Sequence, residues 1–326
     1  MKAMILDAPE ASFRPVEIER PAPGPGQVLV RIEASGVTVL DTKIRAGKAA
    51  HARQPLPAVL GMEMAGVVQE LGEGVTRFEI GDEVYGMTGG VGGHQGSMAE
   101  FVAVEAALLA KKPANLSMRE AASLPLNVIT AWEGLIDRAK VQPGQAVLVQ
   151  GGAGGVGRIV LQLAKAFGAK TFGTGSQDSL APIAALGAAA IDYRKETVAD
   201  YVAKHTGGKG FDIVYDTAGG SSLDNSFAAV ARSGHVVSAL GWSTHALAPL
   251  SFKAASYSGV FTLLPLLTGE GGAHHGEILE KAAKLVEEGL LKPHLDPRAF
   301  TLADADRAHL AVTDKSAKGK VVISIP

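Results

Sequence analysis

Three glycines near the middle of the chain have the spacing of a phosphate-binding turn. Gly152, Gly154 and Gly157 satisfy the pattern G-x-G-x-x-G, and Gly155 and Val156 lie between them. In such a turn one glycine permits the tight bend, one lets the backbone approach a pyrophosphate, and one lets a helix pack closely on a strand. The free N–H groups and positive dipole end of the following helix then bind the phosphates. This spacing predicts a dinucleotide site.

The segments that flank the glycines are the ones that such a turn needs. Residues 146–150 (Ala-Val-Leu-Val-Gln) are a short, largely apolar run, typical of a buried strand. After the glycines, apolar residues recur with helical spacing as far as Phe167, and Gly168 supplies a stop. This context favours a dinucleotide site over an ordinary strand–helix turn, which the glycines alone leave open.

The composition indicates a folded protein of about two domains. The chain has 326 residues, of which 47% are apolar and 20% charged, with a formal net charge of −2. A net charge this close to zero does not indicate binding to nucleic acid or to an anionic membrane. The longest apolar run, residues 259–267, is too short to span a membrane, and no N-terminal signal segment is visible. We therefore expect a soluble, cytoplasmic protein.

The chain contains no cysteine, which excludes disulfides, thiolate nucleophiles and any zinc site that uses cysteine. Nine histidines are scattered along the sequence, and His274 and His275 are the one close pair. Adjacent residues point to different faces of a helix, so we expect solvated or capping histidines here rather than metal ligands.

The first 125 residues predict short strands and turns, as in a small barrel-like β domain. From Pro125 strand and helix patterns alternate, which predicts a doubly wound parallel sheet with crossover helices. The predicted strands are 27–33, 66–72, 83–86, 99–104, 146–150, 170–174, 190–192, 211–215, 235–240, 257–263 and 320–325. The predicted helices after the glycine turn are 180–186, 198–205, 223–231 and 278–289.

Several short motifs, in order, resemble the landmarks of the medium-chain dehydrogenase/reductase superfamily, in its zinc-independent quinone oxidoreductase-like (zeta-crystallin-like) branch. They are residues 36–47, 61–66, 81–86, 96–101, 124–131 and 319–322. The resemblance implies an α/β fold with a Rossmann domain, residues 126–264, and a GroES-like catalytic domain of β-barrel type, residues 1–125 and 265–326. It also implies a homodimer.

Three departures from the superfamily pattern bear on the chemistry. Its zinc alcohol dehydrogenases have a cysteine near the position of Thr38 and a histidine at the position of Met62, while Glu63 is kept. The four-cysteine lobe for a structural zinc is also missing. A catalytic zinc needs three protein ligands, so we expect no metal. Hydride transfer to a quinone or an α,β-unsaturated carbonyl then fits best, because it needs only hydrogen-bond donors at the developing oxyanion.

The candidate catalytic residues, Thr38 and Asp41, come from the resemblance. Thr38 stands where quinone reductases usually have an asparagine that donates to the substrate carbonyl. Asp41 matches an aspartate of the family, which we interpret mainly as structural, capping the turn or pairing with Arg45, rather than as a group that transfers a proton directly. Lys43 is a further possible donor, or a solvated surface lysine.

The residue about 20 positions beyond the turn selects the nicotinamide cofactor. Counting from Gly157 gives Ser176, where an NAD site has a carboxylate that would repel a 2′-phosphate. We therefore expect NADPH rather than NADH, although Asp178 nearby weakens the argument. Ser176 as a plain helix cap is the alternative.

The remaining candidates lie at strand ends and in family motifs. Gly241 and Trp242 follow the fifth predicted strand of the second domain, so we expect them to edge the nicotinamide. The resemblance adds Tyr193 at the adenosine phosphate and Thr130 in the hinge motif. The full predicted cofactor set is Thr130, Gly152, Gly154, Gly155, Val156, Gly157, Ser176, Tyr193, Gly241 and Trp242.

Two other functions remain open at this point. One is a non-catalytic NADPH-binding protein of crystallin type, and the other is an alcohol dehydrogenase with substituted metal ligands. The expected partner of the leading hypothesis is a small quinone or enone, with no nucleic acid and no membrane.

Overall fold

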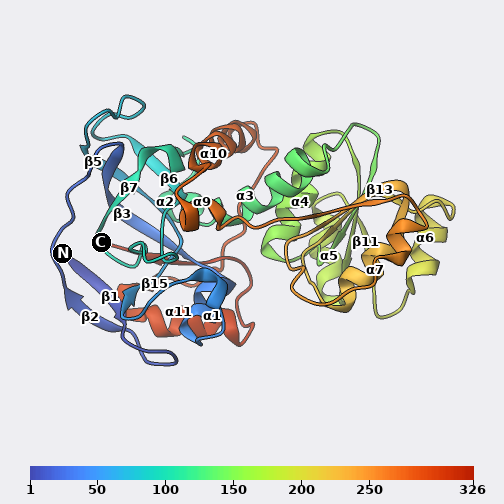
Figure 1. Ribbon diagram of the computed structural model, residues 1–326, viewed down its shortest axis with the longest axis horizontal. Helices are drawn as coiled ribbons and strands as arrows, with labels where there is room; N and C mark the ends of the chain where they lie inside the picture. Colours follow the sequence, from blue (N-terminus) through green and yellow to red (C-terminus); the bar gives the residue numbers. More distant parts are fainter. The chain divides into compact units, whose positions relative to one another are not determined.

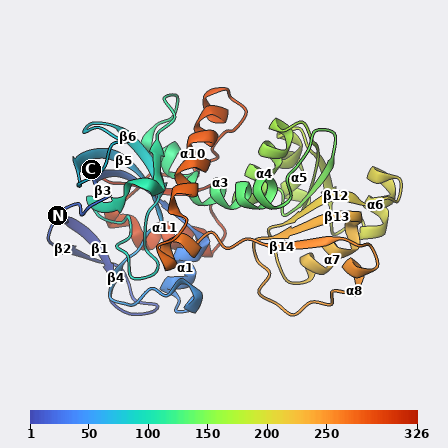
Figure 2. The same cartoon turned by 45° about the horizontal axis from the view of Figure 1, so that its top comes forward.

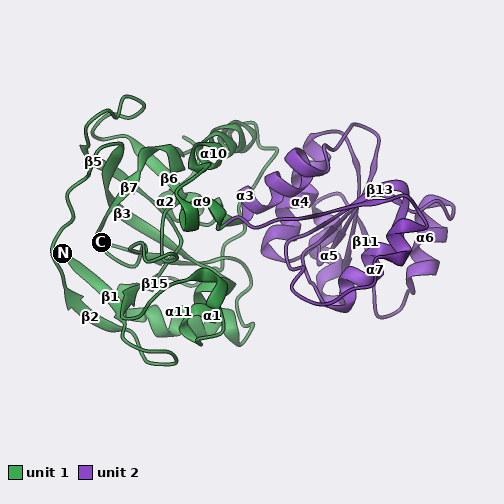
Figure 3. Ribbon diagram, viewed as in Figure 1, with its two compact units in different colours: residues 1–126, 263–326 green, residues 127–262 purple.

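The chain folds into two compact units, and the computed structural model describes residues 1–326. Residues 1–126 and 263–326 form the first unit, and residues 127–262 form the second (Figure 3). None of the helices is long and apolar enough to cross a membrane.

The second unit is built on a six-stranded sheet in which every neighbouring pair is parallel. The strand order is β11-β10-β9-β12-β13-β14. The chain runs outward from β9 in one direction, then returns to continue from β12 in the other. Ligands of such sheets bind beyond the carboxyl ends of the strands at this switch point. The prediction of a doubly wound sheet is confirmed, with strands β9 (Ala146–Gln150), β10 (Lys170–Gly175), β11 (Ala189–Asp192), β12 (Phe211–Asp216), β13 (Val230–Ser238) and β14 (Ser256–Gly259).

Helices connect these strands (Figure 1). The predicted helix 223–231 ends earlier in the structure, because Val230 already pairs with Phe211 as part of β13. The predicted sixth strand, 257–263, is shorter and ends at Gly259. The helices of this part of the chain are α3 (Pro125–Trp132), a π-helical segment (Glu133–Arg138), α4 (Gly155–Ala166), α5 (Gln177–Ala185), α6 (Val198–Thr206), α7 (Ser221–Ala229) and α8 (Ala248–Ser251).

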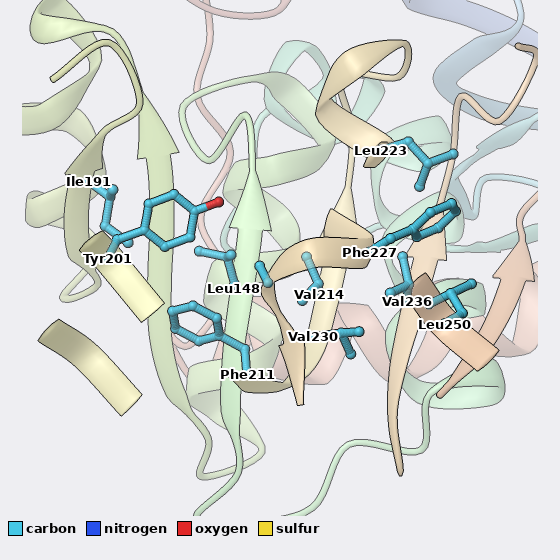
Figure 4. Close-up of a cluster of buried hydrophobic side chains, with 11 residues drawn as sticks. Leu148, Ile191, Tyr201, Phe211, Val214, Leu223, Phe227, Val230, Val236 and Leu250 are labelled. Atoms are coloured by element: carbon cyan, nitrogen blue, oxygen red, sulfur yellow. The ribbon is translucent and has the colours of Figure 1, made fainter. Parts of the chain in front are cut away.

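A cluster of buried apolar side chains fixes one face of this sheet (Figure 4). Leu148, Phe211 and Val214 come from central strands, while Tyr201 comes from α6 and Phe227 from α7. Burying side chains of this size contributes roughly 1.5–3 kcal/mol each relative to exposure. The strand ends that carry the candidate site are therefore held by a rigid layer.

The first unit is mainly antiparallel β-structure, as the prediction of a barrel-like β domain requires. One sheet has the order β15-β16-β3-β5-β6-β8 with β7 also paired to β3, and a smaller sheet has the order β2-β1-β4. The strands are β1 (Lys2–Leu6), β2 (Arg14–Glu17), β3 (Gln27–Val37), β4 (Ala58–Val59), β5 (Glu63–Leu71), β6 (Glu83–Met87), β7 (Phe101–Glu105), β8 (Leu109–Lys111), β15 (Phe300–Thr301) and β16 (Val321–Ser324).

The helices of the first unit show where local patterns were insufficient. The helix expected from Ile278 begins at Gly272, and His275 within it is fully buried, so the expectation of solvated histidines was wrong there. Gly276 allows this helix to approach the chain at residue 107, where a Cβ would lie 2.4 Å from a backbone oxygen. The helices are α1 (Val39–Arg45), α2 (Met118–Ala122), α9 (Leu264–Thr268), α10 (Gly272–Glu287) and α11 (Ala305–Thr313).

Candidate active site

The glycine turn joins β9 to α4 at the carboxyl edge of the sheet. Gly151 has a φ of 78°, the left-handed conformation that glycine adopts without strain. A Cβ on Gly157 would lie 2.2 Å from the Gly151 carbonyl oxygen, so helix and turn pack too closely there for any side chain. These two glycines are needed by the fold itself.

Gly154 is different, because the fold of the unit does not need a glycine at its position. Its φ of −70° and ψ of 169° are open to any residue. The nearest atom to a Cβ built there is 3.4 Å away, which is ordinary contact. Apart from the adjoining residues, no other atom lies within 4 Å of such a Cβ, so the space there is open. The turn therefore fits a phosphate group that approaches the backbone closely.

The N-terminus of α4 offers donors to such a group. Gly154 is the N-cap residue, and no side chain caps the helix. The first N–H groups of a helix lack intrahelical acceptors and form the positive end of its dipole. Because α4 spans 12 residues, it presents a complete anion-binding end.

Ser176 lies directly after β10 and is the N-cap residue of α5, but its side chain makes no capping hydrogen bond. Its hydroxyl lies 3.3 Å from the Ser179 hydroxyl. Two exposed cations follow the neighbouring strand, Arg194 and Lys195, and Lys195 donates to Gln177 at 2.7 Å. This strand end thus carries hydroxyls and cations, together with the exposed carboxylate of Asp178.

Tyr193 is exposed, with the Arg194 guanidinium 5.8 Å from its ring centroid. It lines a cavity of about 310 Å³ together with Gln150 of β9 and Tyr201 of α6. Gln150 is fixed in this wall, because its Oε1 accepts from the Thr174 hydroxyl at 2.7 Å. Of these three residues, only Tyr193 was predicted to belong to the cofactor site.

The other predicted cofactor residues of this unit lie toward β13 and β14. Gly241 and Trp242 follow β13, and the Trp242 side chain is 58% exposed with its ring 5.8 Å from that of Phe261. Thr130, in α3, is buried, and its hydroxyl lies 2.9 Å from that of Thr262.

In the first unit, Thr38 and Asp41 form a reciprocal cap at the start of α1. The Thr38 N–H and hydroxyl both donate to Asp41 Oδ2 at 2.7 Å, and the Asp41 N–H donates to Thr38 Oγ1 at 3.0 Å. The capping role considered for Asp41 is confirmed, while Arg45 instead pairs with Asp306. Lys43 is exposed.

Asp41 is fully buried, and its second oxygen, Oδ1, has no hydrogen-bond partner. Burial raises the pKa of Asp41 to about 6, against the lowering effect of the two Thr38 hydrogen bonds and of the Lys320 charge. A carboxyl group with such a pKa exchanges a proton near neutral pH.

Two further charged residues, Glu63 and Lys320, adjoin this pair, and neither was predicted to belong to the site. Glu63, at the start of β5, is fully buried, accepts from the Leu126 N–H at 2.8 Å and forms an ion pair with Lys320. Lys320 stands directly before β16, and β16 and β5 both pair with β3. Register across three strands therefore assembles a cluster of one cation and two carboxyl groups at the start of α1.

The second position that departs from the zinc enzymes, Met62, is fully buried as well. No group of three or more His, Asp or Glu side chains in the chain is arranged to hold a metal ion.

Two family models match the chain. Residues 24–114 match the alcohol dehydrogenase GroES-like domain, and residues 186–323 match a model described as zinc-binding dehydrogenase.

Whole-chain relatives are also similar. A 2-methylene-furan-3-one reductase from Solanum lycopersicum is 39% identical over 91% of this chain and 71% of its own length. An NADPH-dependent alkenal/one oxidoreductase, chloroplastic, from Arabidopsis thaliana is 36% identical over 91% of this chain and 72% of its own. The crystal structure of an alcohol dehydrogenase superfamily protein from Novosphingobium aromaticivorans superposes with a TM-score of 0.98 and 55% identity, over 100% of both chains.

Proposed function

The chain belongs to the medium-chain dehydrogenase/reductase superfamily, in its quinone oxidoreductase-like branch, and from this premise we propose that it is an NADPH-dependent reductase of quinones or α,β-unsaturated carbonyls. The observation that carries the proposal is the buried Thr38–Asp41 pair, a hydrogen-bond donor backed by a titrating carboxyl group where zinc relatives have a metal ligand. The names of the two plant relatives support the same reaction class.

We assign cofactor binding to the second unit and substrate binding to the first. Gly154 and the N-terminus of α4 are proposed to hold the pyrophosphate of the dinucleotide, with Gly152, Gly155, Val156 and Gly157 shaping the turn. When bound, NADPH supplies the hydride. The absence of a carboxylate at Ser176 and the cations Arg194 and Lys195 support NADPH over NADH.

Thr38 and Asp41 are proposed to handle the proton of the reaction. In the structure the Thr38 hydroxyl hydrogen points to Asp41 Oδ2. When Asp41 is protonated, it can donate to Thr38 Oγ1 instead, and the Thr38 hydroxyl is then free to donate to an enolate or phenolate oxygen. The two hydroxyl orientations thus connect the buried carboxyl group with the substrate oxygen through one side chain.

The proposed chemistry does not use zinc. The family description names zinc, but the two ligand positions hold a hydroxyl, Thr38, and a thioether, Met62, in this chain. Neither belongs to the nitrogen, thiolate and carboxylate ligands that catalytic zinc sites use.

Assembly and location belong to the same proposal. We propose a homodimer in which β14, paired on one side only, lies at the contact; the 87% exposed ring of Phe252 shortly before it supports this. Light scattering of the purified protein measures the assembly.

We also propose that the enzyme is cytoplasmic. Cell fractionation tests this location, because one relative is chloroplastic.

A matched pair of variants tests the catalytic assignment. Thr38→Ser keeps both the cap and the hydroxyl, whereas Thr38→Val removes both. We expect Thr38→Ser to retain turnover of an enone within about threefold, and Thr38→Val to lose on the order of a hundredfold in kcat, within the usual range for a proton-transfer group. Equal kcat in a folded Thr38→Val protein would contradict the assignment.

A further inference from the structure

A hydrogen-bonded chain crosses the carboxyl ends of three adjacent strands in the second unit. Asp216 ends β12, Ser238 ends β13, and Tyr257 lies in β14. These strands are paired in parallel side by side (Figure 2). This row of side chains ends at the Tyr257 hydroxyl, which lies close to Gly241.

The direction of each hydrogen bond follows from the donors available. The Ser238 hydroxyl donates to Asp216 Oδ2 at 3.1 Å and accepts from the Leu240 N–H at 3.1 Å. A serine hydroxyl has one donor and two acceptor positions. Because Ser238 already donates its own proton to Asp216, a hydrogen bond between Tyr257 and Ser238 has to use the tyrosine proton. Burial raises the pKa of Tyr257, so the phenol stays a donor at neutral pH.

Asp216 is the inner end of this row of side chains. Its side chain is fully buried, and its carboxylate also accepts from the Gly219 N–H at 2.9 Å and the Ala218 N–H at 3.4 Å. A buried carboxyl group that accepts from several donors is held firmly, because each lost bond leaves a buried polar group without a partner. Asp216 and Ser238 are therefore held in place at the strand ends beside Tyr257.

The Tyr257 hydroxyl in turn limits the size of the residue at position 241. A Cβ on Gly241 would lie 2.3 Å from the Tyr257 hydroxyl oxygen, and the next atoms are at 3.6 Å (Tyr257 Cζ) and 3.8 Å (Ser238 Oγ). Gly241 has no positive φ that would otherwise require glycine. The Tyr257 oxygen is thus the one protein atom that a Cβ at position 241 would meet at less than van der Waals distance.

We propose that Tyr257 is a positioning residue for the nicotinamide half of the cofactor, whose hydroxyl, fixed through Ser238 to Asp216, holds the Gly241 backbone at the edge of the site. This inference rests on the proposed function, which places NADPH at this sheet edge. The adenosine half is assigned to the other side of the switch point, near Ser176 and Tyr193, and is not affected by Tyr257.

The first test is a rescue experiment. We expect Gly241→Ala to weaken NADPH binding at least tenfold, because the methyl group and the phenol oxygen cannot both keep their places. Tyr257→Phe removes that oxygen and one hydrogen bond, for a loss of about three- to tenfold. In the double variant the nearest atom is in ordinary contact, so its affinity should return to that of Tyr257→Phe alone.

The second test separates positioning from general damage. The same variants are titrated with 2′,5′-ADP, which carries only the adenosine half of NADPH and should bind each of them as it binds the wild type. Tyr85→Phe is the matched control for removal of a tyrosine hydroxyl, since Tyr85 lies in the first unit, where its hydroxyl donates to the Leu279 carbonyl at 2.7 Å. That control should leave the affinity for NADPH unchanged.

The outcomes are distinguishable. A double variant as weak as Gly241→Ala, or equal losses for NADPH and 2′,5′-ADP, would overturn the role of Tyr257 while leaving the proposed function intact. A wild-type protein that binds no NADPH would overturn the proposed function and this inference with it.

Discussion

The glycine turn and the charged cluster are built in different ways. The turn after β9 uses backbone N–H groups from a few consecutive residues, and its specificity comes from side chains that are missing. The cluster of Thr38, Asp41, Glu63 and Lys320 uses buried side chains from three separate segments. Backbone donors do not titrate, whereas the cluster holds a carboxyl group whose pKa is raised to about 6. The turn is thus suited to binding that does not depend on pH, whereas the cluster is suited to proton exchange.

The largest effect should come from removing the single cation of the cluster. In Lys320→Met two buried carboxyl groups lose their compensating charge, which typically costs about 3–5 kcal/mol of unfolding free energy. Lys204→Met is the matched control, because Lys204 pairs with Glu196 at the surface and should matter by about 1 kcal/mol or less. Urea unfolding measures both. Equal stability of the two variants would mean that the cluster does not depend on Lys320.

The pH dependence of stability should show the raised pKa of Asp41. Between about pH 4 and about pH 6 the unfolded chain has released this proton while the folded protein still holds it. The contribution of Asp41 to the free energy of unfolding therefore falls by about 3 kcal/mol as the pH rises through that window. Above the window this contribution is constant. Asp41→Asn keeps an acceptor for Thr38 and removes the titration. The difference between the two unfolding curves should change with pH, and a constant difference would contradict the assignment.

Gly154 tests the turn. In Gly154→Val the side chain should occupy the place of the pyrophosphate, so we expect NADPH affinity to fall about a hundredfold or more, roughly 3 kcal/mol. The melting temperature should stay close to that of the wild type, because the backbone there is ordinary and uncrowded. Gly157→Val should instead destabilise the unit itself. Unchanged NADPH binding in folded Gly154→Val would place the cofactor elsewhere.

The cofactor preference should respond to one charge. Ser176→Asp places a carboxylate against the 2′-phosphate, for an expected loss on the order of 1–3 kcal/mol, or roughly ten- to a hundredfold in NADPH affinity. NADH lacks this phosphate and should bind equally well or better. Asp178→Ser sharpens the comparison, because it should raise NADPH affinity. If Ser176→Asp weakens both cofactors alike, the assignment of this strand end is wrong.

The contrast between the two sites also explains what the sequence could predict. Strand, turn and α4 form one continuous segment, so periodicity and glycine spacing were enough to predict them. The pairing of Glu63 with Lys320 depends on the register of β16 and β5 against β3, which no local pattern specifies. The chain of Asp216, Ser238 and Tyr257 likewise depends on strand order. The early start of α10 was missed because the glycines around it resemble a loop, while contacts with residues 107–109 stabilise it as helix.

The central claim is tested most directly by turnover of the purified protein after exhaustive treatment with a metal chelator, using an enone and a quinone, with NADPH and NADH side by side. The account predicts steady oxidation of NADPH that chelation leaves unchanged, with a slower rate for NADH. Tightly bound zinc at about one per chain whose removal abolishes turnover, or binding of NADPH with no oxidation by any such substrate, would contradict it.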